Sequence, residues 1–253
     1  MAKKLNKKGQ VTIFVIIALI IVVSMLLLFL LFKAPEPEII DEDNPQAFIE
    51  SCTREAVEEA LDILMPQGGD INPKGSLMYY NINRTYLCYN ANYYLPCINQ
   101  RPMLIEHVEN EINNYIEPRV ANCFNILKSK LEERYAIETG DMNLNTKIGP
   151  NQISVKINKY FKISKEDKTI TFEEFKINII HPIYDILKIA MEIVDQEIRF
   201  CNFDILGYMV FYPRFGLEKL RPGNSETIYK IKDRTTNEEF IFAIRSCALP
   251  PGF

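Results

Sequence analysis

Apolar residues form one long run near the start of the chain, broken only by Thr12 and Ser24, and recur with helical or strand spacing after it. The run Val11–Phe32 contains no charged side chain. At about 1.5 Å per residue, a helix of this length reaches roughly 33 Å, enough to cross a hydrocarbon core of about 30 Å. Backbone groups in lipid must bond within their own segment. The pattern therefore predicts a single transmembrane helix over residues 11–32.

The charges on the two sides of this run differ in sign. Residues 1–10 carry lysines and no acidic residue, whereas residues 33–44 are acidic and contain Pro35 and Pro37. Because the positive flank of a span stays in the cytoplasm, we expect a basic cytoplasmic tail, an acidic linker and an extracytoplasmic remainder held at the cell membrane. A cleaved secretory signal is the alternative. Such a signal has a shorter apolar region and a small-residue cleavage site, which residues 31–34 do not offer.

A three–four spacing of apolar residues after the linker predicts long helices. Asn44-Pro45 gives an N-cap followed by proline at the first helical position, so a helix is expected over residues 45–64. A second helical region is expected over residues 102–135, where Pro118 predicts a kink or a break into two helices. The segment between them, residues 70–101, is irregular and rich in tyrosine.

The period changes in the second half of the chain, after a boundary marked by glycines at 140 and 149. Ile153, Val155 and Ile157 alternate with polar residues and predict a half-buried strand. Further strands are predicted over residues 169–172, 175–179, 208–212, 227–231 and 240–244, and a helix over residues 182–199. This order predicts an α+β fold with helices packed on an antiparallel sheet. It comprises a helical, Cys- and Tyr-rich subdomain over residues 45–140 and an α+β subdomain over residues 150–253.

The residues directly before the apolar run, Lys7-Lys8-Gly9-Gln10-Val11-Thr12, resemble the class III signal of archaeal type IV pilin-like proteins. In that family a prepilin-type peptidase cuts after the glycine. The resemblance implies a processed bond between Gly9 and Gln10, and other pilin-like subunits as partners. Many pilins carry a glutamate at the fifth mature position, where this chain has Phe14, which argues against filament assembly more than against cleavage. A simple signal anchor is the alternative.

All six cysteines follow the apolar run, on the side expected to be oxidising. Their even number predicts disulfides rather than free thiols. Six cysteines allow 15 pairings, among which the sequence alone does not choose. The pairs we expect are Cys88–Cys97 closing a short loop, Cys52–Cys123 tying two helices, and Cys201–Cys247 tying a helix end to the last strand. A zinc site built from the first four cysteines is the alternative, but no Cys-x-x-Cys pair is present.

The tyrosine-rich segment supplies the candidate contact surface. Tyr79, Tyr80, Tyr93 and Tyr94 are the predicted contacts to a ligand or glycan, because tyrosine offers a large amphipathic surface at low entropic cost. The alternative is a disulfide-pinned hairpin laid over the core, since strands are also enriched in aromatic residues. Asn83 begins an Asn-x-Thr pattern and is a candidate glycosylation site.

Charge and missing motifs exclude several classes of function. The net charge is −4 and no cluster of basic residues lies beyond the tail, which argues against nucleic acid as a partner. His107 is expected to be a solvated helix residue and His181 to lie where a helix starts; neither belongs to a catalytic or metal motif. No catalytic, cofactor or metal residues are therefore predicted.

The sequence predicts a membrane-anchored, outward-facing structural or adhesive surface protein of pilin-like type, without catalytic activity or a cofactor. Its expected partners are membrane lipid through residues 11–32, and further pilin-like subunits or a surface ligand. An anchored extracytoplasmic binding or sensor module is the first alternative. An extracytoplasmic hydrolase is the second, because its carboxylates could be scattered through the sequence without a recognisable motif.

Overall fold

The computed structural model describes residues 17–24, 44–92 and 94–247. The chain divides into two units, Met1–Asp41 and Glu42–Phe253, each considered by itself. In the first unit the described residues are the helical residues 17–24. The second unit contains all of the helices and strands discussed below.

The transmembrane helix expected over residues 11–32 is not found, and the predicted fold class is corrected on this point. Residues 17–24 are helical, while the rest of that range lies outside the described residues. Within the described parts of the chain, no helix combines the length and the apolar character that a membrane span needs. The α+β arrangement itself is confirmed.

The second unit contains helices and strands in alternating blocks. The helices are α2 (Pro45–Leu64), α3 (Leu104–Leu131), α4 (Ile183–Phe200) and α5 (Ile205–Phe211). The strands are β1 (Ser76–Tyr79), β2 (Ile82–Tyr89), β3 (Ile98–Asn99), β4 (Ala136–Gly149), β5 (Gln152–Lys165), β6 (Lys168–Ile180), β7 (Phe215–Gly223), β8 (Glu226–Asp233) and β9 (Glu239–Arg245).

The strands form two sheets. β4, β5 and β6 make an antiparallel sheet, and the other sheet has the order β1-β2-β9-β8-β7, with β3 also paired to β2. β2 and β9 run parallel, so the expectation of an antiparallel sheet is wrong at this pair. Parallel neighbours need a long crossover connection, and more than half of the chain lies between these two strands.

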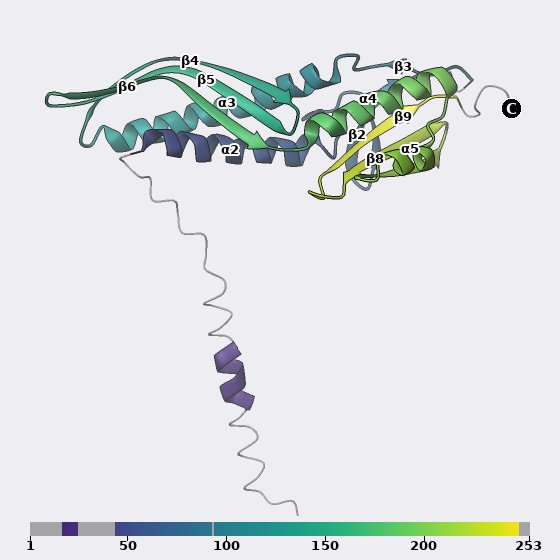
Figure 1. Cartoon of the computed structure of the whole chain (residues 1–253), viewed down its shortest axis with the longest axis horizontal. Coiled ribbons are helices and arrows are strands. Elements are labelled where there is room, and N and C mark those ends of the chain that lie inside the picture. The colour runs from purple at the N-terminus through teal and green to yellow at the C-terminus, as the bar shows by residue number, and fades with distance from the viewer. Residues whose placement is uncertain (1–16, 25–43, 93, 248–253) are drawn as a thin grey trace, which may run out of the picture. The chain divides into compact units, whose positions relative to one another are not determined.

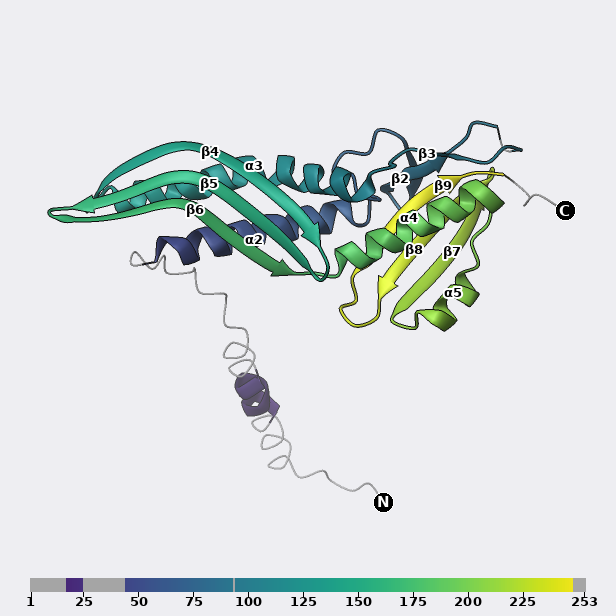
Figure 2. The ribbon, with the colours of Figure 1, turned by 45° about the horizontal axis from the view of Figure 1, so that its top comes forward.

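Helices cover both sheets. β4, β5 and β6 curve over the pair α2 and α3, whereas α4 lies across the sheet that contains β8 and β9 (Figures 1 and 2). The first layer encloses Phe124. The centroid of its ring lies 6.0 Å from that of Phe161 and 5.1 Å from that of Phe175. The second layer encloses the fully buried rings of Tyr229 and Phe242, 5.6 Å apart. The two layers give the unit two aromatic cores.

The predicted helix boundaries agree well with α2 and less well with α3. Asn44 caps α2 by accepting a hydrogen bond from the amide of Ala47 at 3.1 Å, and Pro45 is the first helical residue. α3 runs through Pro118 as one helix rather than two. Pro118 and Asn114, whose carbonyl loses its helical partner, are both exposed, so water can bond to that carbonyl.

Three of the elements, α5, β4 and β7, differ from the prediction. Residues 208–212 were expected as a strand, but most of them belong to α5, where the side chain of Asp204 accepts hydrogen bonds from the amides of Leu206 and Gly207. Strands β4 and β7 were not expected. A short apolar run with aromatic and β-branched residues suits a helix or a strand equally, and here the cap at Asp204 selects the helix.

The six cysteines pair as Cys52–Cys123, Cys88–Cys97 and Cys201–Cys247, the same three pairs expected from the sequence. The Cα–Cα distances are 6.4, 5.4 and 5.5 Å, within the usual range for disulfides. No cysteine remains free among the described residues, which include all six. The zinc alternative for these cysteines is therefore removed.

His181 lies directly before α4, as the sequence predicts. Its side chain is 11% exposed, and its Nδ1 accepts a hydrogen bond from the amide of Ile183 at 3.1 Å. Burial lowers the pKa of His181 to about 4, although the nearby charges of Asp233 and Asp62 act in the opposite direction. The imidazole is thus held neutral in the fold while it titrates normally in the unfolded chain.

We therefore expect His181 to destabilise the fold in mild acid. Because the folded pKa lies below the unfolded value, its protonation favours unfolding as pH falls from about 6.5 to 4, with a full effect of about 3 kcal/mol. Urea unfolding across this window measures the effect. His181→Asn keeps an acceptor for the amide of Ile183 and should show a flatter pH dependence. An identical slope in both proteins would contradict the assignment.

Candidate functional site

The turn that follows α2 places Asp70 in the interior of the fold. Gly68 and Gly69 have φ values of +74° and +94°, which favour glycine. A Cβ on Gly68 would lie 3.1 Å from Phe242, and one on Gly69 would lie 3.0 Å from Val108. The turn is therefore packed between α3 and the second sheet, and it places Asp70 there with only 3% of its surface exposed.

Asp70 is the centre of a polar cluster. Its Oδ2 accepts hydrogen bonds from Thr85 Oγ1 at 2.8 Å and Arg101 Nη2 at 3.0 Å, and its Oδ1 contacts Nε2 of His107. Burial by itself raises the pKa of Asp70, but the bonds from His107 and Thr85 and the charge of Arg101 outweigh it and lower the pKa. Asp70 is thus a buried carboxylate that stays ionised.

Helix α3 adds two further side chains to this cluster. His107 and Glu111 lie one turn apart on the same face, as residues four positions apart do. Glu111 Oε2 accepts a hydrogen bond from the amide of Ile71 at 2.8 Å, which ties α3 to the residue after Asp70. One donor atom each of Asp70, His107 and Glu111 lies within 4.8 Å of the others. These three residues could hold a metal ion.

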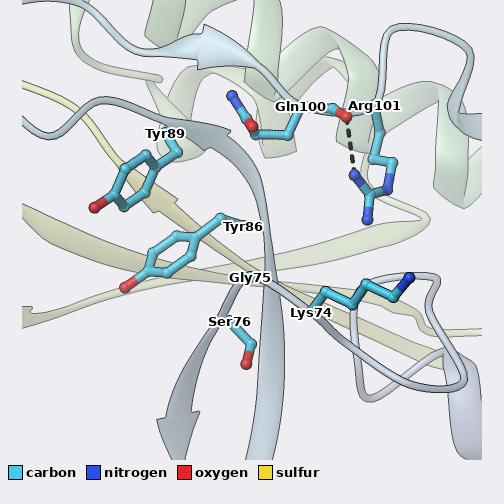
Figure 3. A pocket seen from close by; sticks show the side chains of 7 residues that line it. All are labelled: Lys74, Gly75, Ser76, Tyr86, Tyr89, Gln100 and Arg101. Atoms are coloured by element: carbon cyan, nitrogen blue, oxygen red, sulfur yellow. Dashed lines mark hydrogen bonds between the residues drawn. The ribbon is translucent and has the colours of Figure 1, made fainter.

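A pocket of about 530 Å³ lies beside the cluster. Figure 3 shows the rings of Tyr86 and Tyr89 on one side and the cationic side chains of Lys74 and Arg101 on the other. The two rings, both from β2, stand edge to face with centroids 5.1 Å apart. The remaining lining residues are Gly75, Ser76 and Gln100. The pocket therefore combines an aromatic side with a polar, positively charged side.

The two tyrosines are fixed by their hydroxyl groups. Tyr86 donates a hydrogen bond to Glu226 at 2.8 Å, and burial together with that carboxylate raises the pKa of Tyr86. The hydroxyl of Tyr89 accepts a hydrogen bond from Arg245 at 3.0 Å. Both rings are therefore held in place before any ligand arrives, which lowers the entropic cost of binding.

The two cations differ in how they are held. Arg101 donates hydrogen bonds to Asp70 and to the carbonyl of Gln100, and its Nε lies 3.3 Å from Nε2 of His107. Two of its five N–H groups are directed at none of these partners and remain for a ligand. Lys74 is exposed, and across residues 44–92 and 94–247 it has no ion-pair partner. The pocket thus offers one positioned guanidinium and one uncommitted ammonium group.

The tyrosines predicted as contacts lie elsewhere. Tyr79 and the 80% exposed Tyr80 lie at the turn between β1 and β2, with rings 4.4 Å apart, and Tyr94 is exposed. Tyr93 lies outside the described residues. Sequence reasoning missed Tyr86 and Tyr89 as a pair because residues three apart point to opposite faces of a regular strand.

The ladder between β2 and β9 explains how Tyr86 and Tyr89 come to share a pocket. It shifts register between Tyr86 and Cys88, and this irregularity interrupts the alternation. Sequence reasoning also missed the environment of His107, which is half-buried against Asp70 rather than solvated. The four-residue spacing of His107 and Glu111 on a helix was the one available signal.

The two candidate modification sites stay predictions. Asn83 lies half-buried on β2, and Thr85 of its pattern is fully buried with its hydroxyl bonded to Asp70. Gly9 and Gln10, the residues of the implied processing bond, lie outside the described residues.

Comparison with known proteins found no relative: no family model, no curated protein and no solved structure matches the chain. The pilin-like resemblance therefore stays an expectation drawn from residues 7–12. A function for this chain has to be inferred from the chemistry of its own site.

Proposed function

We propose that this chain is an extracytoplasmic binding protein of adhesive type, and that its pocket takes an acidic saccharide. The observation that carries the proposal is the pairing of Tyr86 and Tyr89 with Lys74 and Arg101 around one pocket of about 530 Å³. That volume lies within the range of small-molecule sites, roughly 300–1,000 Å³.

The lining matches the chemistry of a sugar acid. Aromatic rings pack against the apolar face of a sugar ring, while Ser76 and Gln100 can bond to its hydroxyl groups. The guanidinium of Arg101 and the ammonium of Lys74 suit a carboxylate, which forms stronger hydrogen bonds with charged donors. An uncharged saccharide would leave Lys74 without a partner, so the acidic form is favoured.

The disulfides support a location outside the cytoplasm. Three disulfides are expected in an oxidising compartment and are rare where thiols are kept reduced. The resemblance of residues 7–12 to a class III signal is consistent with export. Both features suit a protein whose ligand belongs to a cell surface.

Binding is favoured over hydrolysis by the composition of the pocket. Glycoside hydrolases use a pair of carboxylic acids that flank the bond to be cut. The described residues that line this pocket include no carboxylate; Glu226 lies behind Tyr86 and accepts a hydrogen bond from its hydroxyl group. We therefore propose binding, rather than hydrolysis, at this pocket.

The test is isothermal titration of the oxidised full-length chain with trigalacturonate and, separately, with uncharged galactotriose. We expect only the acidic probe to bind. Lys74→Gln should weaken its binding about tenfold, the effect of losing one hydrogen-bonded charge, whereas Lys130→Gln, an exposed lysine on α3, should change nothing. Equal affinity for both probes, or no binding of either, would overturn the proposal.

A further inference from the structure

We infer that Asp70, His107 and Glu111 form a binding site for one divalent transition-metal ion. The donor atoms of these three residues already lie within 4.8 Å of one another. A tetrahedral zinc ion with bonds of about 2.0–2.2 Å holds its ligands about 3.3–3.6 Å apart, roughly 1 Å closer than this limit. Small side-chain rotations therefore bring all three donors onto one ion.

The donor set indicates the class of metal. One imidazole nitrogen with two carboxylate oxygens suits zinc and its first-row neighbours, whereas calcium and magnesium prefer oxygen donors alone. No cysteine competes for the ion, because all six are in disulfides. The only other histidine, His181, is buried beside α4 and bonded to the amide of Ile183.

Two of the three ligands, Asp70 and Glu111, are held by contacts that a metal ion would leave intact. Asp70 is fixed by Thr85 through Oδ2, which leaves Oδ1 directed at His107. Glu111 uses Oε2 on the amide of Ile71 and keeps Oε1 for an ion. Such hydrogen bonds orient the ligands of metal sites in general.

Arg101 now supplies the positive charge that the cluster needs. The carboxylates of Asp70 and Glu111 lie together in the cluster, and the guanidinium of Arg101 is the cation beside them. Its Nη2 lies 3.0 Å from Asp70 Oδ2, and its Nε lies 3.3 Å from Nε2 of His107. The same ring nitrogen therefore faces both Arg101 and Asp70, and a neutral imidazole can satisfy only one of them there. A divalent ion bound at this nitrogen and at Asp70 would take the place of Arg101.

Displacement of Arg101 links the ion to the pocket, a consequence that rests on the proposed function. The Arg101 side chain is 29% exposed and borders both the cluster and the pocket. Released from Asp70, it can direct more of its N–H groups at a carboxylate in the pocket. Zinc should therefore raise the affinity for trigalacturonate, and trigalacturonate should raise the affinity for zinc by the same factor.

The experiment is isothermal titration of zinc chloride into the oxidised, untagged, EDTA-treated full-length chain, without saccharide. We expect one ion per chain. His107→Gln and Glu111→Gln should each weaken binding about 100-fold, a loss at the upper end of that seen when the support of a metal site is removed. The glutamine side chain introduced by Glu111→Gln can still accept the hydrogen bond from the amide of Ile71. Glu106→Gln, at a neighbouring position on the same helix, is the matched control and should leave the affinity unchanged.

Two outcomes would overturn this inference: no zinc binding by the parent chain, or binding that survives both substitutions in the cluster. Circular dichroism melting of each variant shows that it is folded before titration. Because these titrations contain no saccharide, their result is independent of the proposed function. Failure of trigalacturonate to bind, with zinc binding intact, would remove the saccharide and keep the metal site.

Discussion

Replacing Cys52 and Cys123 together by alanine is expected to lower the free energy of unfolding by about 4 kcal/mol. This disulfide joins α2 to α3 across a sequence separation of 71 residues. A crosslink stabilises the fold mainly by restricting the unfolded chain, and the effect grows with the length of the closed loop. Urea unfolding of the variant and the parent chain, both oxidised, measures the loss.

The Cys88–Cys97 pair is the matched comparison, because its separation is only 9 residues. Its replacement by alanine should cost about 2.5 kcal/mol on the same entropic argument. The test is which of the two losses in unfolding free energy is larger, rather than the size of either. A larger loss for the short loop than for the long one would contradict chain restriction as the source of the stabilisation.

Lys219→Met is expected to destabilise the fold by about 3–5 kcal/mol, because it leaves a buried carboxylate without its cation. The Lys219 ammonium lies 3.1 Å from Glu197, and their side chains are only 10% and 3% exposed. Burial lowers the pKa of Lys219, while Glu197 acts against this change. Glu197 also accepts a hydrogen bond from the hydroxyl of Tyr229.

A second substitution separates the lost charge from lost packing. Adding Glu197→Gln to Lys219→Met removes the unpaired charge and keeps an acceptor for Tyr229, so it should restore much of the stability. Lys230→Met is the control, since Lys230 pairs with the 56% exposed Glu218 and should cost about 1 kcal/mol or less. Equal losses of stability for Lys219→Met and Lys230→Met in thermal melts would contradict the expected cost of leaving the buried Glu197 without its cation.

Much of the fold could be predicted because local chemistry determines it. Asn44-Pro45 starts α2 and the glycine pair at 68–69 ends it, and both signals act within a few residues. The alternation along residues 153–157 likewise marks β5. The predicted spanning helix over residues 11–32 was wrong, since none of the described helices is both long enough and apolar enough to cross a membrane. Its prediction rested on hydropathy, which reports how apolar a segment is but not how long a helix it forms.

The site was harder to predict because long-range packing assembles it. Asp70 and His107 are 37 residues apart, and a glycine turn packed against Phe242 brings them together. Tyr86 and Tyr89 share the pocket beside an irregularity in the pairing of β2 with β9, far along the chain. Because β9 lies so far from β2 along the chain, no periodic pattern within β2 indicates which strand it pairs with or in which register.

Binding of an acidic saccharide in the pocket between β2 and the loop before α3 can be followed residue by residue. The measurement is the set of backbone amide chemical shifts of the oxidised chain during titration with trigalacturonate. We expect the largest changes at residues 74–76, 86–89 and 100–101, which line the pocket or adjoin its lining residues. Changes centred instead on Tyr79 and Tyr80, or no changes at millimolar probe, would contradict the proposed function.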